Sequence, residues 1–108
     1  MKILNKVYKD ENFIDNLSSL FKTPFRKDWV GRIYAIFNPH IQEGIFDQNN
    51  QMTLYFENIR VRLGDISNID DKIIRLKAIL PELEGQKGIL RMENYVDGMK
   101  NITFNTDS

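Results

Sequence analysis

Residues Met52–Gly64 read MTLYFENIRVRLG, and this stretch decides the fold. Its apolar residues fall on every second position, first at Met52, Leu54 and Phe56 and then at Ile59, Val61 and Leu63. Strict alternation of apolar and polar residues is typical of a strand with one buried face. The alternation breaks at Glu57-Asn58, so we predict two strands joined there by a tight turn into an antiparallel hairpin. Arg60 and Arg62 fall on the opposite face of the second strand.

We expect a helix at 68–80, directly after this hairpin. Its apolar face consists of Ile69, Ile73, Leu76 and Leu80, broadened by Ile74 and Ile79. Ser67 is the predicted N-cap, Asp70 and Asp71 favour the positive end of the helix dipole, and Pro81 ends the helix. The basic side chains of the other face, which we expect to contact water, are Lys72, Arg75 and Lys77.

The first part of the chain predicts a helical segment over 11–37. Apolar residues at the spacing of one helix face indicate a helix from about Glu11 to Phe21 and a second over 29–37, which Asn38-Pro39 ends. The aromatic residues of the second helix are Trp29, Tyr34 and Phe37. These residue types also stack on bases or sugars, but we expect them to be core, because a helical apolar stripe is usually buried.

The remaining segments predict further strands. Residues 41–46 form a short extended segment, 88–95 alternate again, Asp97-Gly98 is a strong turn signal, and Lys100–Phe104 is the final strand. The order lacks the strand–helix–strand alternation of parallel sheets. We therefore predict an α+β fold, with an antiparallel sheet over 41–108, helices packed on one face and the final hairpin at the sheet edge.

Composition fits one domain over 1–108 and excludes several classes of function. The 108 residues are 42% hydrophobic and 28% charged, which is ordinary globular usage. Fifteen basic residues balance fifteen acidic ones, which disfavours non-specific binding of nucleic acid or anionic lipid. There is no Cys, hence no disulfide or thiolate site. No apolar run approaches the ~20 residues of a membrane span and no signal peptide is present, so we expect this chain to be soluble.

The residues that carry catalytic chemistry are few and scattered. His40 is the only histidine and lies in a predicted exposed turn, whereas a zinc site takes three or four protein ligands. Ser18-Ser19 lack the glycine-flanked turn of a nucleophilic serine. The nearby acids Asp65, Asp70 and Asp71 do not have EF-hand spacing and suit a turn and a helix start. We therefore expect no catalytic residue, metal, cofactor or small-molecule substrate.

The final strand offers a second kind of function. Asn101–Phe104 is short, β-prone and uncharged. If this strand closes the sheet, its unpaired main-chain groups form an open edge that a partner strand can use. If it lies inside the sheet, no such edge exists. Sequence alone leaves both possibilities open.

Residues 52–104 resemble the C-terminal β domain of the FtsQ/DivIB bacterial cell-division proteins. The most specific piece is the basic-alternating strand ending in Leu63-Gly64, followed at fixed distance by a helix with the Asp71-Lys72 start and the LKAIL centre at 76–80. Over 13–45 only the order of elements is similar. Two positions depart from the family pattern, because Asn58 stands near a usual hairpin glycine and Arg91 stands where Asp is frequent.

The resemblance implies a non-enzymatic divisome scaffold on the extracytoplasmic face of the cell membrane at the division septum. It would link FtsB (DivIC) and FtsL to septal peptidoglycan synthesis. In the family the partner adds a β-strand to the last strand, which maps onto Asn101, Ile102, Thr103 and Phe104, with Tyr95 as a neighbour. Asn101 and Thr103 would then select the partner, while Ile102 and Phe104 hold the strand to the core.

The family's cytoplasmic tail, transmembrane helix and POTRA domain have no counterpart in this sequence. We therefore expect either an excised terminal domain, with membrane attachment only through an absent tether, or a different protein that begins at Met1. The alternative function is that of a small phage or mobile-element structural or regulatory protein acting through self-association. A hydrolase is the weakest hypothesis, and it would need a cleft that holds His40 with carboxylates.

Overall fold

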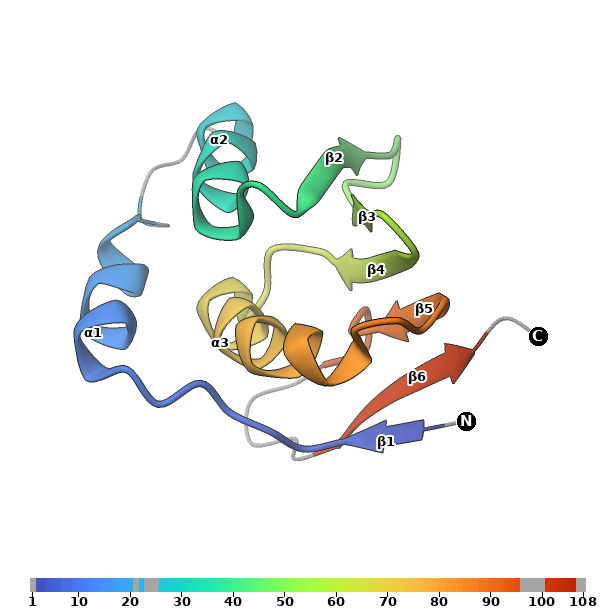
Figure 1. Ribbon diagram of the computed structural model, residues 1–108. Helices are drawn as coiled ribbons and strands as arrows, with labels where there is room; N and C mark the ends of the chain where they lie inside the picture. The colour runs from blue at the N-terminus through green and yellow to red at the C-terminus, as the bar shows by residue number, and fades with distance from the viewer. Residues whose placement is uncertain (1, 21, 23–25, 96–100, 107–108) are drawn as a thin grey trace.

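The computed structural model describes residues 2–20, 22, 26–95 and 101–106 (Figure 1). The strands are β1 (Lys2–Leu4), β2 (Ile41–Phe46), β3 (Met52–Phe56), β4 (Ile59–Gly64), β5 (Gly88–Arg91) and β6 (Ile102–Thr106). The helices are α1 (Glu11–Leu20), α2 (Arg26–Phe37) and α3 (Ile69–Ile79), and α3 continues into the 3-10 turn η1 (Leu80–Leu83). The predicted turn at Asp97-Gly98 and the strand residue Lys100 lie outside the described residues.

The α+β prediction is confirmed. The strands form one six-stranded sheet in the order β1-β6-β5-β4-β3-β2. The predicted hairpin is present as β3 and β4, which pair antiparallel, and β5 pairs antiparallel with β6. The helices cover one face of the sheet, and the two terminal strands, β1 and β6, lie together at one edge (Figure 1).

The prediction of an entirely antiparallel sheet was wrong at one junction. β4 and β5 are parallel neighbours, in register from Ile59 opposite Gly88 to Arg62 opposite Arg91. Together with α3 they form a strand–helix–strand unit, which the sequence interpretation had excluded. The physical reason is that α3 carries the chain back along the sheet, so that β5 begins at the same end as β4.

The core lies between the sheet and the helices. The alternate residues of β3 and β4 that were predicted to face inward are all buried, as are Trp29 and Phe37 of α2. Residues with no exposed surface include Leu17 of α1, Val61 of β4, Leu90 of β5 and Phe104 of β6, together with Ile73, Leu76 and Ile79 of α3. The interpretation of the α2 aromatics as core is therefore confirmed for Trp29 and Phe37, whereas Tyr34 is half-buried.

Helix α3 differs from its prediction at its start and on its basic face. The N-cap is Asn68 in a left-handed conformation and not Ser67, whose backbone N–H donates to Asp65 Oδ1 within the preceding turn. Lys72 and Arg75 are buried, with exposed fractions of 1% and 6%, and only Lys77 is partly exposed. The N-terminal segment covers one side of α3 (Figure 1), where Arg75 Nη2 donates to the Leu4 carbonyl at 3.4 Å, whereas Lys72 Nζ donates to the Asp65 carbonyl in the turn after β4.

Close packing of β5 against β6 predicts that Gly88→Ala destabilises the fold. A Cβ atom at Gly88 would collide with the Asn105 carbonyl oxygen and lie 2.9 Å from both the Phe104 ring and Thr106 Cα. We expect a loss of about 2 kcal/mol in the free energy of unfolding, measured by urea denaturation. The matched control is Gly31→Ala in α2, where a Cβ has no neighbour within 4 Å; it should instead stabilise by about 0.5–1 kcal/mol. Equal effects of both substitutions would contradict this packing.

Candidate functional site: the two ends of the sheet

The final strand is not the outermost strand of the sheet. β6 pairs with β5 on one side and antiparallel with β1 on the other, where Lys2, Ile3 and Leu4 lie opposite Phe104, Thr103 and Ile102. Of the two possibilities left open by the sequence, the structure therefore shows the strand inside the sheet. The three residues of β1 were missed because a strand this short contains too few alternating positions to give a recognisable pattern.

The predicted partner-binding residues occupy different environments on and near β6. Ile102 and Phe104 are buried in the core, as expected of residues that hold the strand in place. Thr103 is half-buried on the opposite face, and Asn101 is exposed just before the strand. Tyr95 is 8% exposed, belongs to the core cluster, and donates its backbone N–H to the Met92 carbonyl at 3.1 Å. Its side chain is therefore poorly placed to contact a partner in this conformation.

β1 covers β6 only in part. Among the described residues its pairing ends at Phe104, whereas β6 continues to Thr106. Leu4 is the one buried side chain of β1, and Ile3 is 59% exposed. The chain after β1 contacts α3 and η1 through a Lys6–Glu82 ion pair at 3.5 Å and through Lys77 Nζ at 5.3 Å from the Tyr8 ring centroid. This end of the sheet is thus closed by a short strand with an exposed apolar residue.

The opposite end, at β2, is protected in three ways. A bulge interrupts the pairing with β3 between Ile41 and Glu43, and Glu43 adds an exposed charge. The Gly44 N–H donates to the Tyr34 hydroxyl of α2 at 2.8 Å. Hydrogen-bonded and non-hydrogen-bonded pairs alternate along an antiparallel ladder. Since Asp47 and Gln51 form a hydrogen-bonded pair, Gly44 and Leu54, three pairs further along, form a non-hydrogen-bonded one. The Gly44 N–H therefore points away from β3. Bulges, charges and covering groups are known protections of edge strands.

Removal of the Tyr34 hydroxyl should weaken this protection. We expect Tyr34→Phe to lower the free energy of unfolding by about 1 kcal/mol, because the Gly44 N–H loses its acceptor. We also expect the variant to associate more strongly through β2, measured by sedimentation at increasing concentration. Tyr55→Phe is the control, since Tyr55 lies on the helix-free face and its hydroxyl has no described hydrogen bond. Equal stability and association of the two variants would refute a protective role for Tyr34.

A groove of about 960 Å³ lies between the C-terminal end of α2, the β3–β4 turn and η1. Phe37, Phe56 and Ile59 contribute apolar surface, and His40 lines the groove together with Glu57 and Glu84. His40 is exposed, as predicted. No hydrogen bond or ion pair joins these three side chains in the described structure. Among the described residues, no group of three or more His, Cys, Asp or Glu could hold a metal ion.

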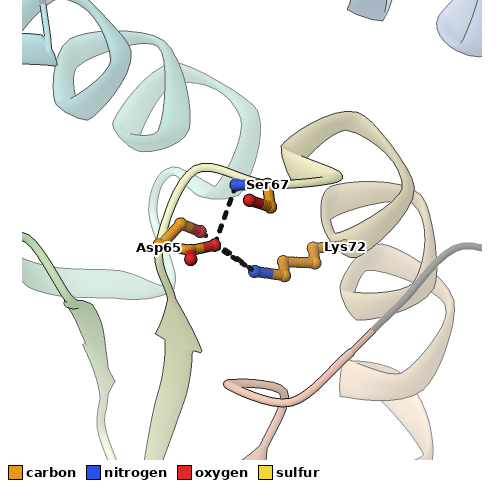
Figure 2. Close-up of polar contacts among 3 residues, drawn as sticks. All are labelled: Asp65, Ser67 and Lys72. Carbon is orange, nitrogen blue, oxygen red and sulfur yellow. Dashed lines mark hydrogen bonds and ion pairs between the residues drawn. The ribbon is translucent and has the colours of Figure 1, made fainter.

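Asp65 and Lys72 form a polar contact between the end of β4 and the first turns of α3 (Figure 2). Lys72 Nζ donates to the Asp65 carbonyl at 2.9 Å and lies 3.7 Å from Asp65 Oδ1. Burial lowers the pKa of Lys72, and the Asp65 carboxylate partly opposes this effect. The hydrogen bonds from Ser67 are the main cause that lowers the pKa of Asp65. Asp65 therefore stabilises the turn and pairs with a buried charge.

The lowered pKa of Lys72 has a consequence for stability at alkaline pH. The unfolded chain holds the Lys72 proton more tightly than the folded chain does. The free energy of unfolding should therefore increase as pH rises from the folded-state pKa toward the ordinary lysine value of about 10.4. Lys72→Met should remove this contribution and stay within about 1 kcal/mol of wild type at neutral pH. Urea denaturation between pH 7 and 10 measures both effects. The exposed Lys87→Met is the control, and an identical pH slope in both variants would disprove the assignment.

In the part of the chain that the structure describes, no helix is both long and apolar enough to cross a membrane. Comparison with known proteins adds no relative: no protein-family model matches the chain, and no curated protein or solved structure is significantly similar to it.

Proposed function

We propose that this domain is a protein-interaction module that accepts a partner strand at the β1–β6 end of its sheet. The observation that carries the proposal is the difference between the two ends. β2 is bulged, charged and covered by Tyr34, whereas β1 is three residues long and leaves Ile3 exposed. The protections of β1 are its shortness and the exposed Lys2, so this edge is the weaker of the two, and a weakly protected edge is the part of a sheet to which another chain adds most readily.

The partner strand takes the place of β1 beside β6. Displacing β1 exposes one buried side chain, Leu4, at a cost of about 1.5–3 kcal/mol, and it breaks a pairing of three residues and the hydrogen bond from Arg75 to the Leu4 carbonyl. A longer strand could pair with all five residues of β6, Ile102–Thr106. Ile102 and Phe104 stay in the core during this exchange. Main-chain hydrogen bonds supply affinity, and Thr103 and Asn101 contribute selectivity.

The resemblance of residues 52–104 to the FtsQ/DivIB β domain supports a specific partner and cellular role. The proposed function is that of a non-enzymatic divisome scaffold at the extracytoplasmic face of the septal membrane. Its partners are proteins of the FtsB/DivIC and FtsL type, and binding helps to control septal peptidoglycan synthesis. No cofactor takes part. The fold is compatible with this role, since the hairpin, helix and final strands follow one another in the order that the resemblance requires.

The test uses the FtsB/DivIC homologue encoded by the same organism, titrated into the wild-type chain and into Ile3→Pro. Proline removes a main-chain donor from β1 and disfavours its pairing. If the partner replaces β1, calorimetry should show an affinity about tenfold higher for Ile3→Pro, and the backbone amides of Ile102–Thr106 should shift on binding. Gln42→Pro, in the bulge of β2, is the matched control at the other end.

Each other outcome opposes a distinct part of the proposal. Absence of binding by the wild type would overturn the divisome role. Binding with equal affinity for both chains and without shifts in β6 would overturn the site. Concentration-dependent dimerisation of the wild type that Ile3→Pro abolishes would instead favour the self-associating phage or mobile-element protein, since an exposed β1 can pair with a second copy.

A further inference from the structure

The helix-free face of the sheet carries a row of side chains that crosses all six strands. Strand register places them side by side in the order Ile45, Thr53, Arg62, Arg91, Thr103 and Ile3. These residues alternate with the buried residues of their strands and point away from the core. None of the six positions carries a carboxylate, and two arginines occupy the centre of the row.

Arg62 and Arg91 lie directly opposite each other on the parallel strands β4 and β5. Neighbouring strands are about 4.8 Å apart, and like charges placed opposite one another destabilise a sheet. Arg91 has a counter-ion, because its Nη1 lies 3.2 Å from Glu93 Oε1. Arg62 is exposed and forms no ion pair among the described residues, although Asp47 and Glu93 line the same small pocket. The arrangement therefore leaves a positive charge at the middle of the row.

The neighbouring row strengthens this charge and adds apolar surface. Arg60 lies beside Arg62 on β4, with its guanidinium carbon 5.5 Å from the Tyr55 ring centroid. Ile89 lies opposite Arg60 on β5 and is half-buried. The acid of this row, Glu43, is on β2 next to Tyr55, and so it is separated from Arg60 by one strand.

We infer that this face binds an acidic segment of a protein partner, with a carboxylate bridging Arg62 and Arg91. Arginine is suited to this role because its planar fork accepts a carboxylate in a bidentate manner. Thr53 and Thr103 flank the pair and can donate hydroxyl hydrogen bonds, while Ile45, Ile89 and Ile3 offer apolar contacts. Such an alternation of charge with apolar surface suits a peptide, whereas nucleic acid is held by many phosphate contacts that a face with three arginines does not provide. This surface shares Thr103 and Ile3 with the strand edge proposed above, but its charged centre, Arg62 and Arg91, lies on β4 and β5, away from that edge.

The probe is a 12-residue peptide of alternating glutamate and alanine, with the glutamine–alanine peptide as reference. In a ¹H–¹⁵N titration, the glutamate peptide should shift the Nε–Hε signals of Arg62 and Arg91, and the glutamine peptide should not. Arg62→Gln should weaken binding about tenfold. The same substitution should raise the thermal midpoint by about 2 °C, because it removes the like-charge pair. The control is Lys9→Gln, which removes the same charge at an exposed position of the N-terminal segment. It should change neither the affinity for the peptide nor the thermal midpoint.

Three results would overturn the inference. The first is an absence of shifts at the arginine pair. The second is a lower thermal midpoint for Arg62→Gln, which would show that Arg62 is satisfied within the fold. The third is Arg62-dependent binding of phosphatidylglycerol vesicles or single-stranded DNA that is stronger than binding of the glutamate peptide. Because these measurements use no FtsB/DivIC protein, this inference and the proposed function can fail independently.

Discussion

The burial of α3 is the interaction on which the rest of the structure depends. Ile73, Leu76 and Ile79 lose all contact with water, and on its other side the helix is covered by the N-terminal segment. Because α3 returns the chain along the sheet, β5 pairs parallel with β4 and β6 can continue the sheet beyond it. Arg75 of the same helix donates to the Leu4 carbonyl at 3.4 Å, so α3 also contacts β1, which pairs with β6. One helix thus sets the parallel junction of the sheet and contacts the strand that closes its end.

The consequence for function is an asymmetric sheet. At β2 the main chain is bent by a bulge and the Gly44 N–H has an acceptor on α2. At β1 the closing strand contributes one buried side chain. The same sheet has one face filled by the core and another that carries Arg60, Arg62 and Arg91. The strand edge would bind a partner through main-chain hydrogen bonds. The helix-free face would bind a partner through its charged side chains.

The predictions for the site were accurate where they concerned side-chain alternation and incomplete where they concerned neighbours. Ile102 and Phe104 are in the core as expected, because the period of two assigns their face. The position of β6 inside the sheet could not be derived, since it depends on Lys2–Leu4 approaching from the far end of the chain. The opposition of Arg62 and Arg91 was equally hidden, although both arginines were visible on alternating positions. Only the register of β4 against β5 brings them together.

The sequence by itself determined the elements: the β3–β4 hairpin, α3, the helical segment before them and the exposed turn of His40. Each of these follows from local periodicity, proline and turn residues, which act within a few positions along the chain. The tertiary structure alone decided which strands are neighbours, and which charged residues of α3 are buried. A pattern within one helix carries no information about what covers it: Arg75 contacts Leu4, about 70 residues away, and Lys72 contacts Asp65 in the turn before the helix.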